Sequence, residues 1–121
     1  MKNPRLADSF HHALNGLRVA VAKERNFKIH IACAALAVAA CIIFSVDTVH
    51  FALVAIAIGC VLAAELFNTA IEALTDLSCG GKPHPLAKAA KDTAAAAVLV
   101  AAAQAAIVGI IVAVSVIKRY L

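Results

Sequence analysis

Three acidic side chains and one amide share a face of a single stretch of this sequence, Ala64 to Leu77 (AELFNTAIEALTDL). At about 100° per residue they fall at roughly 0°, 300°, 340° and 20° on a helical wheel, in the order Glu65, Asn68, Glu72 and Asp76. Carboxylate and amide oxygens are hard ligands that suit Mg²⁺, and a carboxylate can also take a proton from a hydroxyl group. The stretch therefore predicts a polar helical stripe with metal or acid–base chemistry.

An apolar run precedes the stripe and sets the depth of its first carboxylate. Residues 51–64 carry no charge and reach about 21 Å as a helix, whereas a bilayer core is about 30 Å thick. We therefore expect Glu65 inside the membrane and Glu72 near its inner edge. A carboxylate at that depth is costly unless it meets a polar cleft, a cation or a partner, which favours a functional site. The alternative is that the carboxylates merely mark the interfacial end of a helix.

The composition around the stripe is that of an integral membrane protein. Of the 121 residues, 64% are hydrophobic and the mean hydropathy is +0.93, whereas soluble domains have about 45–50% apolar residues. The sequence contains neither a Walker A motif nor a protein-kinase signature, which excludes the common nucleotide-binding folds. Three of the four cysteines lie in apolar runs without CxxC spacing, and we interpret them as packing residues.

The N-terminal segment is predicted to lie on the membrane surface. Between Leu6 and Val21 the apolar residues gather on one side of a helical wheel, which predicts an amphipathic helix over about 5–25. If the helix continues that far, Glu24 returns to the apolar side, where a carboxylate needs a partner. The alternative for Glu24 is a pair with Lys28 or a position on a frayed last turn.

Three apolar runs are long enough to cross a bilayer, and we place spanning helices at about 29–46, 49–77 and 93–117. His30, at the entrance to the first, is interpreted as an interfacial hydrogen-bonding residue. Glycines and prolines in residues 78–86 predict a loop, and the last helix is expected to begin near Leu86. The expected fold is one all-α membrane domain over residues 1–121, with three transmembrane helices and a surface helix. Because three helices enclose little interior, we expect a homo-oligomer.

Basic residues near the spans predict the orientation. The segment before the first span has six, the 47–50 turn none, the 78–91 loop three and the C-terminal end two; the six are Lys2, Arg5, Arg18, Lys23, Arg25 and Lys28. The N-terminus and the second loop are therefore predicted to be cytoplasmic. This topology brings Glu24, the stripe and the pair Lys91 and Asp92 to the cytoplasmic face of the membrane.

Groups that converge in this way suit phosphoryl transfer at a membrane surface. Mg²⁺ takes one or two carboxylates and leaves its other positions to water and phosphates. Lys91, near a predicted helix start, is suited to contact phosphate, and Glu65 is deep enough to take a proton from a lipid hydroxyl. One alternative is a proton-coupled transporter that uses Glu65, which leaves Glu24, Lys91 and Asp92 unexplained. Another is a structural membrane oligomer held together by the stripe.

Three segments of the chain resemble a known family. The stretch ELFNTAIEALTDL, followed by HPLAKAAKDTAAAAVL and preceded by GLRVAVAKERNFKIH, is similar to the prokaryotic diacylglycerol kinases, which include the undecaprenol kinases. The similarity covers about residues 5–117. It implies a homotrimer in the bacterial plasma (inner) membrane, with composite active sites that use ATP and Mg²⁺ to phosphorylate a lipid alcohol, undecaprenol or diacylglycerol. The implied partners are the lipid, ATP and further copies of the chain, and no nucleic acid.

The resemblance also implies roles for individual residues. Glu65 matches the general base, and Glu24 and Glu72 match the metal-binding glutamates. The nucleotide- and phosphate-binding positions are Arg5, Asn68, Asp76, His84, Lys91 and Asp92. The chain departs from the family at Lys82 and Pro83, where many relatives have an acidic or aromatic residue near the adenine. Its ERNFKIH and AKAAKDTAAAAVL segments are closer to the undecaprenol kinase branch, which favours undecaprenol as the acceptor.

Overall fold

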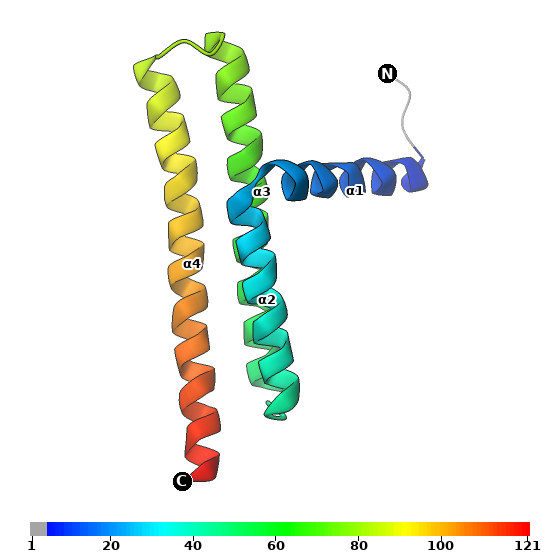
Figure 1. Ribbon diagram of the computed structural model, residues 1–121, viewed down its shortest axis with the longest axis vertical. Coiled ribbons are helices and arrows are strands. Elements are labelled where there is room, and N and C mark those ends of the chain that lie inside the picture. Colours follow the sequence, from blue (N-terminus) through cyan, green and yellow to red (C-terminus); the bar gives the residue numbers. More distant parts are fainter. Residues whose placement is uncertain (1–4) are drawn as a thin grey trace.

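The computed structural model describes residues 5–121, which form four helices (Figure 1). In chain order these are α1 (Leu6–Lys23), α2 (Arg25–Ile43), α3 (Thr48–Cys79) and α4 (Pro85–Tyr120). No strand occurs within residues 5–121, and α2, α3 and α4 are each long and apolar enough to cross a membrane. The chain is thus an all-α, multi-pass membrane protein with three candidate spans, as predicted. Lys2, one of the basic residues behind the predicted orientation, lies outside the described residues.

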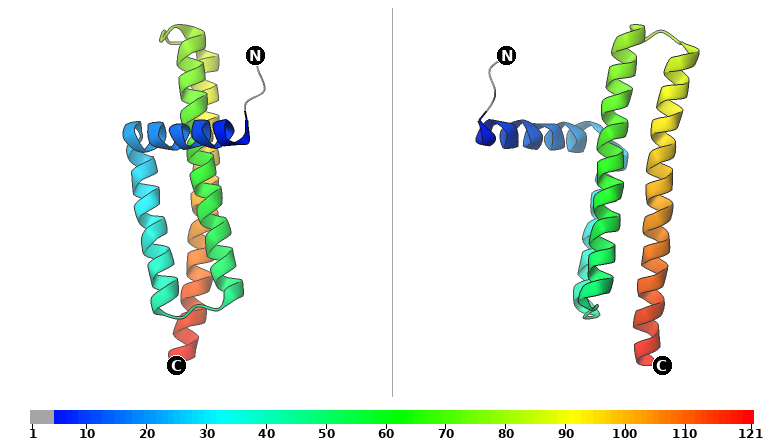
Figure 2. Two further views of the ribbon diagram at one scale, coloured as in Figure 1. Left: turned by 90° about the vertical axis from the view of Figure 1, so that its right-hand side faces the viewer. Right: turned by 180° about the vertical axis from the view of Figure 1, so that it is seen from behind.

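Helix α3 is the centre of the protomer. α2 and α4 run beside it, and α1 projects sideways from its junction with α2 (Figures 1 and 2). At 32 and 36 residues, α3 and α4 are about 48 Å and 54 Å long, which exceeds the roughly 30 Å core of a bilayer. Both helices extend past the level of α1 on the side of the turn that joins them (Figure 1). The protein therefore carries a helical hairpin beyond the plane of its surface helix.

Glu24 forms the corner between the surface helix and the first spanning helix. Its φ of −106° and ψ of 108° are extended, so α1 ends at Lys23. Ala20 and Phe27, each 2% exposed, are buried on either side and anchor the corner. A helix that carries Glu24 on its apolar stripe is therefore a wrong prediction, because the chain has to change direction here. The alternative pair with Lys28 is also wrong, since residues 5–121 contain no ion pair between these two side chains.

The turn between α2 and α3 comes three residues earlier than predicted, because α2 ends at Ile43. Val46 lies beyond the helix end and packs against a small apolar core formed by Cys41, Val54 and Val112. Ser45 takes a left-handed conformation, with φ of 49°. The turn therefore folds back onto the core that joins α2, α3 and α4.

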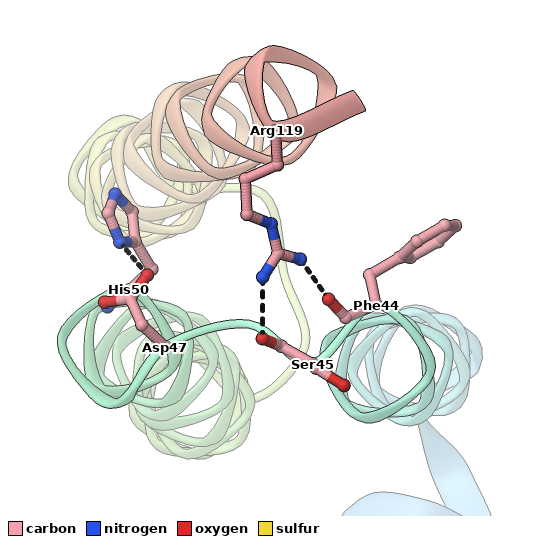
Figure 3. Close-up of polar contacts among 5 residues, drawn as sticks. All are labelled: Phe44, Ser45, Asp47, His50 and Arg119. Carbon is pink, nitrogen blue, oxygen red and sulfur yellow. Dashed lines mark hydrogen bonds and ion pairs between the residues drawn. The ribbon is translucent and has the colours of Figure 1, made fainter. Parts of the chain in front are cut away.

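Asp47 caps the start of α3 at this turn. Its carboxylate accepts hydrogen bonds from the backbone N–H of His50 at 3.3 Å, and its Oδ1 lies 2.6 Å from the His50 Nδ1. The backbone bond is the main reason that the pKa of Asp47 lies below its usual value. Arg119, near the end of α4, donates to the carbonyl oxygens of Phe44 and Ser45 (Figure 3). These contacts attach the C-terminal end of α4 to the turn.

The turn between α3 and α4 begins with two glycines in the left-handed region, Gly80 (φ 61°) and Gly81 (φ 73°). His84 caps α4, because its Nδ1 accepts a hydrogen bond from the backbone N–H of Leu86 at 3.1 Å. Pro85 takes the first helical position, where its missing N–H costs no hydrogen bond. The first turns of α4 and its membrane-spanning part therefore form one uninterrupted helix.

Candidate functional site

The predicted polar stripe lies on one uninterrupted helix, α3. We call its four side chains the polar ladder; they are Glu65, Asn68, Glu72 and Asp76. Glu65 is 3% exposed, whereas Asn68 and Glu72 are half-buried and Asp76 is exposed. The polar ladder thus starts in the packed part of the protomer and ends beside the turn to α4.

Glu65 forms a pair with a histidine of α2. The His30 Nε2 lies 3.2 Å from the Glu65 Oε1, and the side chains are 25% and 4% exposed, respectively. The contact brings polar groups of two spanning helices within 3.2 Å of each other. Within residues 5–121, Glu65 is the one charged side chain that the protomer buries. A polar side chain of a neighbouring helix, His30, thus lies beside the buried carboxylate, which would otherwise be costly to bury.

The contact between His30 and Glu65 also shows the register of α2 against α3, which run in opposite directions (Figure 1). Glu24 precedes His30 by six residues, or about 9 Å of helix, and Glu72 follows Glu65 by seven, or about 10 Å. Both glutamates therefore lie at a similar height on the side of the α3–α4 turn. Helices α1 and α3 also contact each other near the corner.

Asn68 and Glu72 form the middle of the polar ladder. The Asn68 Nδ2 donates to the Glu72 Oε1 at 3.2 Å, which points the amide oxygen away from the carboxylate. This Oδ1 is buried and has no hydrogen-bond partner within residues 5–121. A buried hydrogen-bond acceptor without a donor is rare in proteins. A bound cation or an ordered water can provide the missing partner.

These oxygens fit Mg²⁺, although no three His, Cys, Asp or Glu side chains cluster as metal ligands within residues 5–121. Mg²⁺ usually keeps several waters and binds through one or two carboxylates together with substrate phosphates. The Asn68 Oδ1, the Glu72 carboxylate and Glu24 at a similar height supply hard oxygen atoms of the required kind. The donor set therefore suits a metal that is shared with a phosphate ligand.

Charged side chains of α3 and α4 surround a hollow of about 550 Å³ at the outer end of the polar ladder. The Lys91 Nζ lies 2.5 Å from the Asp76 Oδ1, and the Lys88 Nζ lies 2.5 Å from the Asp92 Oδ2. All four side chains line the hollow, together with Lys82 and His84. The structure thus brings four predicted site residues together here: Asp76, His84, Lys91 and Asp92.

Lys91 lies near a helix start, as predicted, whereas Arg5 lies far from the other predicted site residues. Lys91 is in the second turn of α4, which begins at Pro85, one residue before the predicted start near Leu86. Arg5 lies at the outer end of α1, where its N–H bonds to Asp8 at 3.1 Å. This end of α1 is the one farthest from the helical bundle (Figure 1). Within one protomer, Arg5 is therefore apart from the polar ladder.

Two features of the site were not predicted from the sequence, the pair of His30 with Glu65 and the position of Lys88. His30 was interpreted as an interfacial hydrogen-bonding residue without a named partner. A signal for the pair was available, since His30 precedes Asp47 by 17 residues and Glu65 follows it by 18. Two antiparallel helices joined by a short turn bring such equidistant residues to the same height.

Comparisons with known proteins agree with this architecture. The sequence profile of the family described as "Prokaryotic diacylglycerol kinase" matches residues 11–113. The chain is 42% identical to a diacylglycerol kinase of Synechocystis sp. over 106 residues, which cover 88% of this chain and 61% of that protein. It is 39% identical to an undecaprenol kinase of Bacillus subtilis over 108 residues, which cover 89% of this chain and 87% of that protein. The chain therefore belongs to the prokaryotic diacylglycerol kinase family, a family of lipid kinases.

Proposed function

We propose that this protein is an ATP-dependent lipid kinase that transfers the γ-phosphate to the hydroxyl of a membrane lipid alcohol at the cytoplasmic face. The observation that carries the proposal is the polar ladder, whose buried carboxylate, Glu65, lies on a helix long and apolar enough to span the membrane. A lipid hydroxyl approaches from the membrane, and a soluble nucleotide approaches from the aqueous side. The buried end of the polar ladder, at Glu65, can contact the lipid, and its exposed end, beside the hollow, can contact the nucleotide.

Glu65 acts as the general base in this proposal. It takes the proton of the lipid hydroxyl as the hydroxyl oxygen attacks the γ-phosphorus, and ADP leaves with the electron pair of the broken bond. Its burial supports this role, because a lipid alcohol presents its hydroxyl close to the apolar region where Glu65 lies. The family assignment favours this role over that of a transport carboxylate.

Asn68, Glu72 and Glu24 would hold Mg²⁺ above the base. The metal supplies neutralisation and orientation of the phosphates when it is bound. The unpartnered Asn68 Oδ1 supports this assignment, as does the similar height of the two glutamates. About 10 Å of α3 separates Glu65 from Glu72, so the metal and the base occupy successive positions along the polar ladder.

The hollow between α3 and α4 would take the outer part of the nucleotide. Lys91 and Lys88 supply positive charge for phosphate oxygens, although each is paired with a carboxylate in the protein alone. His84 and Lys82 line the same hollow from the turn. When a lysine of the hollow binds a phosphate oxygen in place of its carboxylate partner, Asp76 or Asp92 would lose its ion pair. Nucleotide binding would therefore change the ion pairs beside the α3–α4 turn.

We propose undecaprenol as the acceptor in preference to diacylglycerol. The family segments ERNFKIH and AKAAKDTAAAAVL support this choice. The two relatives carry one of these names each, at similar identity, so overall similarity does not separate the substrates.

A homotrimer with a cytoplasmic N-terminus completes the proposal. Most large apolar side chains of one protomer are exposed, including Leu99, Val100 and Ile110 on α4, and neighbouring protomers or lipid would cover them. Arg5 lies at the end of α1 that is farthest from its own polar ladder. In a trimer it would contact the site of a neighbouring protomer. The excess of basic residues in the N-terminal segment supports the orientation.

A direct assay tests the proposal. The purified protein is incubated with labelled ATP, Mg²⁺ and a panel of undecaprenol, diacylglycerol and ceramide, and phosphorylated lipid is separated and counted. We expect product with undecaprenol at the highest rate and none without Mg²⁺. Absence of product with every lipid, in a protein that is folded and assembled, would refute the kinase assignment, and proton flux in liposomes from the same preparation would then support the transporter.

A further inference from the structure

The buried carboxylate of the polar ladder has a polar partner that the proposed kinase mechanism does not use. His30 and Glu65 are 3.2 Å apart, from Nε2 to Oε1, and come from two different spanning helices. Within residues 5–121, no hydrogen bond or ion pair to the Glu65 Oε2 occurs. One carboxylate oxygen thus lies beside His30, and the other has no partner in the protomer.

From this geometry we infer that His30 is a positioning residue for the base, and the inference rests on the proposed lipid kinase function. The Nε2–H of His30 donates to Oε1 and fixes the plane of the Glu65 carboxylate, so that Oε2 faces the lipid hydroxyl. The lipid O–H bond breaks, its proton goes to Oε2, and the lipid oxygen forms the bond to the γ-phosphorus as ADP leaves. His30 touches neither reactant and acts through Glu65.

His30 is surrounded mostly by apolar or small side chains. It borders a hollow of about 180 Å³ between α2, α3 and α4, whose other walls are apolar or small side chains such as Cys33, Val61, Leu62 and Ala105. Within residues 5–121, no Asp, Glu, Lys or Arg side chain lines this hollow. Without His30, the buried Glu65 carboxylate would lose the polar group that lies beside its Oε1.

Truncation of His30 is expected to lower kcat about tenfold to a hundredfold, the effect of one hydrogen bond to a charged group. The KM for MgATP should stay within about twofold, because the nucleotide groups lie farther along α3 and on α4. His30→Gln places an amide N–H near the position of Nε2 and should keep most of the rate. His30→Asn is one methylene shorter, so its amide does not reach the carboxylate, and the rate should fall.

A matched control for His30 lies at the start of α3. His50 also pairs with a carboxylate, that of Asp47, with 2.6 Å between Nδ1 and Oδ1, but lies beside the α2–α3 turn. His50→Ala should leave kcat near the parent value. Added imidazole should restore part of the rate of His30→Ala, since it can enter the space of the missing ring, and should not restore Glu65→Gln. A merely structural histidine would show no such rescue.

The test measures kcat, the KM for MgATP and the imidazole response in the full-length assembled protein, for the parent, His30→Ala, His30→Gln, His30→Asn and His50→Ala. The expected pattern is loss in His30→Ala and His30→Asn, retention in His30→Gln, and rescue of His30→Ala. Should His30→Ala fail to assemble, the comparison of His30→Gln with His30→Asn decides. An active parent with equal kcat in these two variants overturns the positioning role alone, whereas a parent that phosphorylates no lipid overturns the proposed function.

Discussion

Replacement of Glu72 by glutamine tests the metal assignment with little change in packing. In the parent, the Asn68 Nδ2 donates to the Glu72 Oε1 at 3.2 Å. The amide oxygen of a glutamine accepts the same bond, so Asn68 keeps its orientation and its Oδ1 keeps its direction. The substitution therefore removes one negative charge and one strong metal ligand, and little else.

The expected size of the effect follows from the small number of protein ligands. Glu24 and Glu72 are the two carboxylates that we assign to Mg²⁺, and waters and phosphates fill the remaining positions. Loss of one of the two should raise the Mg²⁺ concentration for half-maximal activity about tenfold to a hundredfold, which corresponds to about 1.4–2.8 kcal/mol of binding free energy. At saturating Mg²⁺ most of the rate should return, since Glu65 is untouched.

The assay varies free Mg²⁺ at saturating ATP and lipid and counts phosphorylated lipid. Asp47→Asn serves as the control because it also removes one carboxylate, at the opposite end of α3, where asparagine caps a helix as well as aspartate does. The control should show the Mg²⁺ dependence of the parent. If Glu72→Gln does so too, at comparable activity, Glu72 is not a metal ligand and the assignment is refuted.

Three further predictions concern the outer hollow, the far turn and the orientation. Lys91→Met frees Asp76 from its partner and removes a charge from the hollow, so the KM for ATP should rise several-fold in steady-state assays; Lys118→Met, at the other end of α4, should leave it unchanged. Arg119→Gln removes the donors to the Phe44 and Ser45 carbonyls, so a thermal melt in detergent should shift down by a few degrees while kcat stays, and an unchanged melt would deny these bonds a role. A membrane-impermeant maleimide should label Cys79 in inverted vesicles only, with Cys79→Ser as the blank; labelling in right-side-out vesicles would reverse the orientation.

Local patterns in the sequence were sufficient to predict the helices and the polar ladder. The three spans follow from apolar runs, and the common face of Glu65 and Glu72 follows from the helical period, which needs no tertiary information. The family assignment also followed from contiguous segments, and the comparisons confirm it. The metal, base and nucleotide roles of individual residues stay predictions.

Contacts between segments were harder to predict. The corner at Glu24 depends on Ala20 and Phe27 packing on both sides of it, and no periodicity signals where a surface helix must bend into the membrane. The pair of His30 with Glu65 depends on the register of α2 against α3, which the position of the Asp47 turn fixes.

The claim that Glu65 is the base of a lipid kinase is tested most directly by one comparison, lipid phosphorylation by the parent and by Glu65→Gln. The glutamine keeps the size of the side chain and can still place an oxygen atom beside the His30 Nε2, but it cannot take up a substrate proton. We predict that the parent forms phosphorylated lipid from ATP. Glu65→Gln should bind MgATP with similar affinity, but its turnover rate should fall by about a hundredfold or more. Phosphorylation by Glu65→Gln at the parent rate would contradict the account.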